Sequence, residues 1–166
     1  GHSMGGMVLA IYLATHATTP LSAAVTVGSP LDFRDADLVT GTALSSARIG
    51  TGVGFLPTPL GGKLLAATDT STPLSLDELL YNPANMEAEA RELMLRRIVS
   101  PLSRGELRQF GLARTGEFQS ADGTLVYREA LDAVQVPMLF LAGRADRIAS
   151  PERVLAYYDA VGSPDK

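Results

Sequence analysis

The chain opens with Gly1–Gly6, GHSMGG, and runs directly into Met7–Ala14, MVLAIYLA. Apolar residues at positions 4, 7, 8, 11 and 12 fall on one helical face, and most residues between them are apolar as well. We therefore expect a helix that starts after Ser3, is buried nearly all round and ends at Thr18-Thr19-Pro20. A glycine-rich turn that leads straight into a buried helix is the feature on which the fold prediction depends.

The spacing of Gly1, Ser3 and Gly5 matches G-x-S-x-G, the pattern of a nucleophile elbow. In such an elbow the serine occupies a strained strand-to-helix turn, and the flanking glycines remove Cβ atoms that would collide with the strand and the helix. The helix N-terminus and the backbone N–H of Met4 would then favour negative charge beside the serine. The pattern predicts Ser3 as a nucleophile and Met4 as an oxyanion-hole donor. The alternative is a glycine-rich turn with an incidental serine.

Two later stretches are typical of buried parallel strands. Ala23–Val27 is short and rich in β-branched residues, and Val136–Gly143 is an apolar run that ends in glycine. Ser150-Pro151 predicts the start of a further helix, and Ser103–Glu106 has capping-box spacing. Helices alternating with short apolar strands indicate an α/β fold with a mostly parallel sheet.

The composition excludes several classes of function. The 166 residues contain no cysteine and have a formal net charge of -4, so we expect neither disulfides nor a nucleic-acid partner. No apolar run is long enough for a membrane span. No metal-ligand cluster or phosphate-binding glycine loop occurs, so we predict no cofactor and no metal. The lack of cysteine fits a reducing, cytoplasmic compartment.

Three stretches resemble the α/β-hydrolase family of lipases, esterases and acyltransferases. They are the GHSMGG turn, residues 24–33 with their GSPLDF exit, and residues 136–151, VPMLFLAGRADRIASP. The resemblance implies an incomplete α/β-hydrolase fold, with core segments at 1–32 and 121–166 and a helical lid inserted at 33–120. Residues 121–136 are also similar to the polyhydroxyalkanoate synthase branch, whose members use cysteine where this chain has Ser3.

The family order of nucleophile, acid and histidine implies a carboxylate after Ser3. Asp146 follows the second strand at its carboxyl end, where ligand chemistry occurs in such sheets, and is the candidate acid. The alternative is a loop aspartate that turns the chain or pairs with Arg144 or Arg147. Asp32, after the first strand, is the rival acid.

The chain contains two histidines, His2 and His16. His2 adjoins Ser3 within the turn, so its side chain should diverge from the serine hydroxyl. His16 follows the helix, about 20 Å from Ser3 at 1.5 Å per residue. Neither is placed to take the Ser3 proton, so we expect the sequence to be truncated at both ends. The isolated 166 residues would then be inactive and poorly soluble.

We therefore expect a serine hydrolase that cleaves an ester or thioester of a small, apolar acyl substrate through an acyl-enzyme on Ser3. One alternative is an acyltransferase or polyester synthase that passes the acyl group to an alcohol. Another is a non-catalytic relic that acts as a binding module.

Overall fold

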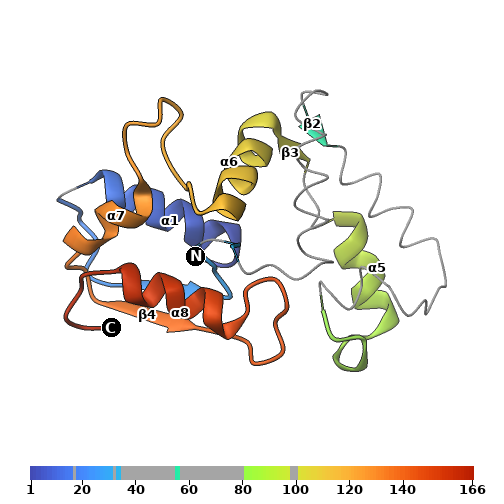
Figure 1. The fold of residues 1–166 in the computed structure, drawn as a ribbon. Helices are drawn as coiled ribbons and strands as arrows, with labels where there is room; N and C mark the ends of the chain where they lie inside the picture. Colours follow the sequence, from blue (N-terminus) through green and yellow to red (C-terminus); the bar gives the residue numbers. More distant parts are fainter. Residues whose placement is uncertain (17, 32, 35–54, 57–80, 98–100) are drawn as a thin grey trace. The chain divides into compact units, whose positions relative to one another are not determined.

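The computed structural model describes residues 1–16, 18–31, 33–34, 55–56, 81–97 and 101–166 (Figure 1). The chain divides into two compact units, one made of Gly1–Leu44 and Gln109–Lys166 and the other of Ser45–Arg108. The lid limits of 33–120 expected from the sequence stay a prediction. Asp32 and most of the middle of that block lie outside the described residues.

A parallel strand pair forms the centre of the first unit. Strand β1, Ala24–Val27, pairs along its whole length with β4, Met138–Leu141. The chain start runs parallel to β1 on its other side, because His2 forms a bridge with Val27 and the Ser3 N–H donates to the Val27 carbonyl at 3.0 Å. The sheet order is therefore the Gly1–Ser3 segment, β1 and β4. All three segments end at the same edge.

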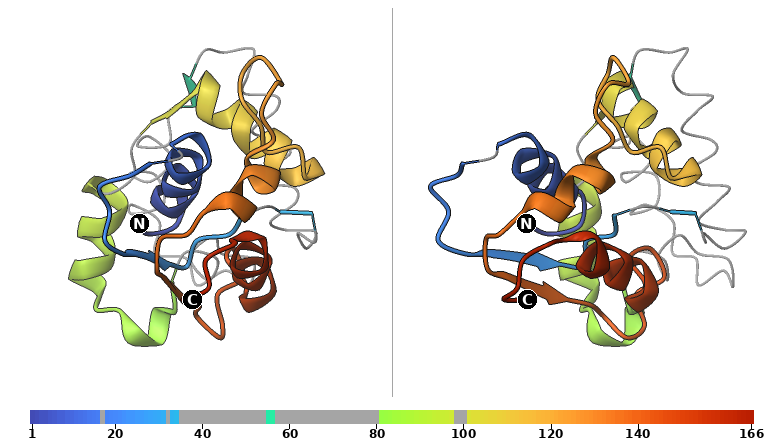
Figure 2. Two further views of the ribbon diagram at one scale, coloured as in Figure 1. Left: turned by 90° about the vertical axis from the view of Figure 1, so that its left-hand side faces the viewer. Right: turned by 60° about the vertical axis from the view of Figure 1, so that its left-hand side comes forward.

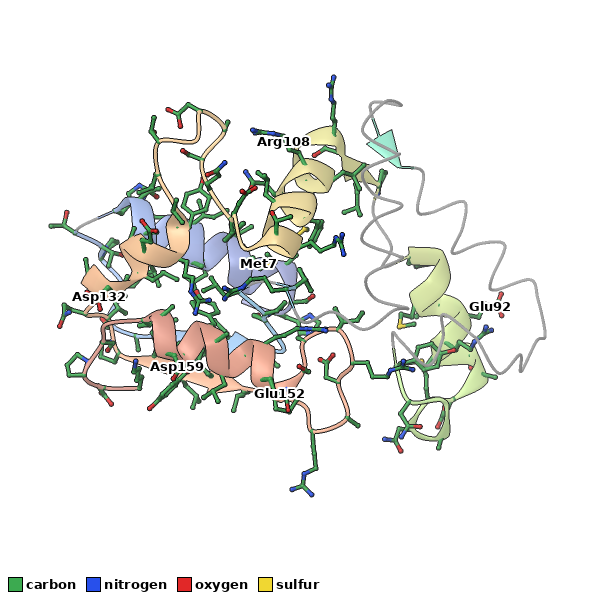
Figure 3. All side chains as sticks on the ribbon, in the orientation of Figure 1. Met7, Glu92, Arg108, Asp132, Glu152 and Asp159 are labelled. Carbon is green, nitrogen blue, oxygen red and sulfur yellow. The ribbon has the colours of Figure 1, made fainter. Side chains whose placement is uncertain are left out.

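Helices cover one face of these strands (Figures 1 and 2). They are α1 (Met4–Thr15), α7 (Tyr127–Ala130), the 3₁₀ turn η3 (Leu131–Ala133) and α8 (Pro151–Ala160). Their apolar side chains form one core with Ala24 and Met138 from the strands. In Figure 3, Met7 projects from α1, whereas the exposed carboxylates of Glu152 and Asp159 lie on α8. This layering confirms the α/β class expected from the sequence.

The opposite face of the strand pair is exposed in the described residues. Alternate positions of β1 bury Ala24 and Thr26, because successive side chains point to opposite faces. The outward positions of both strands carry large apolar side chains, namely Val25, Val27, Leu139 and Leu141. These four residues, the outer sheet face, lie in register with one another across the two strands.

Helix α1 differs from its prediction. It starts after Ser3 as expected but ends at Thr15, before the predicted stop at Thr18-Thr19-Pro20. It is also not buried all round, because Val8 is 57% exposed and Met4 is exposed as well. Its buried residues lie along one side of the helix and are Gly6, Met7, Ala10 and Leu13. A helix on the outside of a sheet buries only that stripe, even where its sequence is apolar on every face.

The second unit holds β2 (Phe55–Leu56), the 3₁₀ turn η2 (Pro83–Asn85), α5 (Ala88–Arg97) and β3 (Leu102–Ser103). Strands β2 and β3 pair antiparallel, and α6, Arg104–Thr115, starts after β3 and continues into the first unit. The capping box predicted at its start is confirmed. The Ser103 N–H donates to Glu106 Oε2 at 2.7 Å, and the Glu106 N–H donates to Ser103 Oγ at 3.2 Å.

No helix in the described ranges combines the length and the apolar character needed to cross a membrane.

Candidate active site

Ser3 occupies a strained turn between the end of the first sheet segment and α1. Its φ of 49° and ψ of -122° make it the non-glycine residue with positive φ among the described parts of the chain. L-residues avoid this region because it strains the backbone. Such strain occurs at functional sites, where the surrounding structure holds the residue in place. Here the Ser3 N–H donates to Val27, and the Ser3 carbonyl accepts from the Gly6 N–H at 2.9 Å.

The glycines around Ser3 play unequal parts. A Cβ atom at Gly1 would lie 2.6 Å from the Gly5 carbonyl oxygen, so a side chain cannot fit there. The steric need expected at Gly5 is wrong, since a Cβ atom at that position meets nothing within 4 Å. Gly6 takes this part instead, because its Cβ would collide with the Ser29 side chain. Close packing of α1 onto the exit of β1 therefore depends on Gly6.

Among the described residues, the Ser3 hydroxyl and the Met4 N–H have no hydrogen-bond partner. Ser3 is half-buried, and no hydrogen bond joins its hydroxyl to any residue that the structure describes. The N–H of Met4, the first residue of α1, likewise donates to none of the described backbone carbonyls. A hydroxyl beside an unused N–H at a helix N-terminus suits attack on a carbonyl and stabilisation of the oxyanion that results.

Asp146 lies in the turn after β4. Its N–H donates to the Gly143 carbonyl at 3.1 Å, and its Oδ1 accepts from the N–H groups of Ile148 at 2.9 Å and Ala149 at 2.8 Å. The Oδ2 atom accepts no hydrogen bond from the described residues and faces Gly28 at the exit of β1. Asp146 is thus held by one oxygen and presents the other.

The alternative readings of Asp146 have different outcomes. Pairing of Asp146 with Arg144 or Arg147 stays a prediction. The two N–H groups on Oδ1 do show that the side chain shapes its own turn. Shaping the turn leaves Oδ2 available for a second task. The rival, Asp32, lies outside the described residues.

The structure brings Ser3 and Asp146 to one edge of the sheet. Ser3 follows the segment on one side of β1, and Asp146 follows β4 on its other side, with Gly28 at the end of β1 between them. Parallel strands place their carboxyl ends together, and this edge is where open α/β sheets bind ligands. The nucleophilic and catalytic roles remain proposals.

Neither histidine forms a hydrogen bond with the Ser3 hydroxyl in the described structure. His2 is exposed and joins the sheet through its backbone. His16 is exposed at the end of α1, stacks on Tyr12 with ring centroids 4.3 Å apart, and places Nδ1 2.9 Å from the Tyr12 carbonyl oxygen. Among the described residues, no group of three or more His, Cys, Asp or Glu side chains could hold a metal ion.

Three buried polar residues around the site were missed from the sequence. Ser29 Oγ donates to the Val27 carbonyl at 3.1 Å, and the Tyr157 hydroxyl donates to the Gly6 carbonyl at 3.3 Å. Arg153 Nη1 donates to the carbonyls of Arg147 at 2.9 Å and Ile148 at 2.7 Å, in the loop after Asp146. Proline after Ser29 marked a turn, but no sequence pattern signalled the other two.

A serine in a positive-φ turn before a helix, on a parallel sheet with a carboxylate at the same edge, defines a class of hydrolytic α/β proteins. The comparison with protein families agrees. The whole chain, residues 1–166, matches the model described as "alpha/beta hydrolase fold", and the chain belongs to this family. Searches of curated proteins and of solved structures found no significant match.

Proposed function

We propose that the protein is a serine hydrolase that cleaves a carboxylic ester or thioester through an acyl-enzyme on Ser3. Membership of the α/β-hydrolase family supports hydrolytic chemistry in general. The observation that carries the serine mechanism is the Ser3 backbone, with φ 49° and ψ -122°, directly before the N-terminus of α1. This strained backbone conformation is the one that exposes the hydroxyl of a nucleophilic serine at the sheet edge.

In the proposed reaction, Ser3 Oγ forms a bond to the acyl carbon while its proton passes to a base. The Met4 N–H stabilises the oxyanion, and the C–O or C–S bond to the leaving group breaks as that group takes the proton. Water then attacks the acyl-enzyme and releases the acid. In the family's mechanism the base is a histidine, and we propose that Asp146 Oδ2 orients this base and stabilises its charged form.

This arrangement indicates the chemical class of the substrate, a compound with an acyl carbonyl. The described edge of the sheet offers a hydroxyl, an N–H and one carboxylate oxygen, which suit an acyl carbonyl. We propose a small-molecule substrate with an apolar acyl group, by analogy with the family's lid.

The test is labelling of the protein, at its natural length, by a fluorophosphonate probe. We expect covalent labelling of Ser3, its complete loss in Ser3→Ala, and a fall of about 10⁴ in turnover of p-nitrophenyl butyrate in Asp146→Asn. His16→Ala is the matched control and should label normally. Labelling that survives Ser3→Ala would overturn the proposal. Ester products formed with added alcohols would instead indicate acyl transfer.

A further inference from the structure

Tyr157 connects α8 to the turn that carries Ser3. Its side chain is fully buried, and its hydroxyl donates to the Gly6 carbonyl at 3.3 Å across 151 residues of sequence. Its ring packs edge-on against Phe140 of β4, with centroids 5.2 Å apart at 75°. Burial also raises the pKa of the Tyr157 phenol above its ordinary range, so the hydroxyl keeps the proton that it donates.

The residue that accepts this bond, Gly6, lies in the first turn of α1, directly after the strained Ser3. The Gly6 N–H donates to the Ser3 carbonyl at 2.9 Å, while the Gly6 carbonyl accepts from Tyr157. On the opposite side, Gly6 has no room for a Cβ because Ser29 lies against it. Gly6, whose N–H bonds to the serine carbonyl, is therefore held by Ser29 after β1 and by Tyr157 of α8 at once. Such over-determination is what lets a residue keep a positive φ.

The same helix is fixed to the other half of the candidate site. Helix α8 starts at Pro151, directly after the loop in which the Ala149 N–H donates to Asp146 Oδ1 at 2.8 Å. Arg153, in the first turn of α8, donates to two carbonyls of that loop. A movement of α8 would thus be passed both to Asp146 and, through Tyr157, to Ser3.

We propose that Tyr157 is a positioning residue that locks the Ser3 turn to the helix carrying the Asp146 loop, and so fixes the serine relative to the carboxylate. This inference rests on the proposed serine hydrolase function. Small misplacements of reacting groups cost large factors in rate, so loss of one hydrogen bond here should be felt in the acylation step rather than in substrate binding.

Tyr158 provides a matched control. Its ring also packs edge-on against Phe140, with centroids 5.6 Å apart at 75°, and its hydroxyl also donates to a backbone carbonyl, that of Lys166 at 3.4 Å. That carbonyl lies at the end of the chain segment after α8 rather than at the Ser3 turn. Tyr157→Phe and Tyr158→Phe therefore remove the same atom from neighbouring positions, and only the first change touches α1.

The experiment compares both variants with wild type in the full-length protein. We expect Tyr157→Phe to lower kcat for p-nitrophenyl butyrate, and the limiting rate of fluorophosphonate labelling, by about three- to tenfold. KM should stay within about twofold, and Tyr158→Phe should match wild type in both rates. Amide hydrogen exchange, which needs no activity, should accelerate in the first turn of α1 only in Tyr157→Phe.

Equal rates in the two variants, or a fall confined to KM, would overturn the inference. Unchanged exchange in the first turn of α1 would do the same. A wild-type protein that takes no label would overturn the proposed function instead, and the exchange comparison would still decide whether Tyr157 holds the turn.

Discussion

Asp146 lies against the exit of β1 at Gly28, with its Oδ2 atom 3.2 Å from the position that a Cβ atom would take at that glycine. Gly28 has a φ of +51°, and its N–H donates to the Leu141 carbonyl at 2.8 Å. A side chain there would press on the carboxylate oxygen that the described structure leaves available. Asp146 Oδ2 therefore stays available because Gly28 has no side chain.

Gly28→Ala should therefore lower activity more than stability. We expect a loss of about 1 kcal/mol in the free energy of unfolding from the positive φ, together with at least a tenfold fall in kcat as the carboxylate is displaced. Gly123→Ala is the control. Gly123 has a φ of +74°, and its nearest neighbour, Gln119 Nε2, lies 3.8 Å from the Cβ position. If both changes reduce kcat equally, Asp146 is not the group affected.

Alanine substitution should have opposite effects on stability at Gly5 and at Gly6. Gly5→Ala meets open space inside α1 and should stabilise the protein by up to about 1 kcal/mol, because alanine is the better helix former. Gly6→Ala drives a methyl group into Ser29 and should cost about 1 to 3 kcal/mol. Urea denaturation of the two variants measures both. A neutral Gly6→Ala would mean that α1 can shift away from the sheet.

Thr26→Val should not destabilise the protein. Thr26 Oγ1 is buried in β1 without a hydrogen-bond partner, so its hydroxyl has lost water and gained nothing. Valine has the same shape, and we expect a gain of about 1 kcal/mol in the free energy of unfolding. Thermal unfolding of the variant is the measurement, with Thr18→Val as the comparison, because the Thr18 side chain is exposed. A loss of stability would point to a polar partner in solution.

The start of α6 should respond to acid. Hydrogen bonds from the Ser103 N–H, first, and the Ser103 hydroxyl, second, hold the pKa of Glu106 below its ordinary value of 4.5. A carboxylate with a lowered pKa contributes stability that is complete above pH 4.5 and is lost as the pH falls through the lower, folded value. An NMR titration of Glu106 should show this, and Ser103→Ala should move the midpoint upward. A midpoint that stays fixed would exclude the hydroxyl as a cause.

The outer sheet face should make the isolated 166-residue chain associate. Val25, Val27, Leu139 and Leu141 form a continuous apolar surface, and such surfaces promote aggregation. Leu139→Lys should lower light scattering and the binding of a dye for apolar surface. Met138→Lys, one position away but facing the core, should unfold the chain. Equal scattering by the wild type and Leu139→Lys would show that this face is covered in solution.

Much of the fold was readable because its signals are local. Strand β1 was predicted within one residue at each end and β4 within two, since short apolar runs bounded by turn residues are typical of strands. Asn82-Pro83 fits an N-cap followed by proline at the first helical position and so predicts a helix from Pro83, but α5 begins at Ala88. The Asn82 side chain accepts from the Ala84 N–H, and a 3₁₀ turn over Pro83–Asn85 uses the backbone groups that a helix would need.

The candidate site was predictable in its reactive residues and not in its supports. Ser3 and Asp146 stand out because glycine spacing and a strand exit mark them. The sequence gives no sign that Tyr157 bonds to Gly6, and the glycine spacing wrongly predicts a steric need at Gly5. The roles of Tyr157 and Gly5 depend on how α1 packs on the sheet. This packing produces no motif or hydrophobic periodicity from which it could be predicted.

The paired strands β1 and β4 are separated by more than a hundred residues of chain. The entropy lost on closing such a loop grows only with the logarithm of its length, about 0.6 kcal/mol for each doubling. The intervening segment is therefore free to lengthen, shorten or be exchanged during evolution with little change in equilibrium stability. The penalty falls on kinetics, because contacts between distant parts of a chain form slowly, and the core cannot assemble until they do.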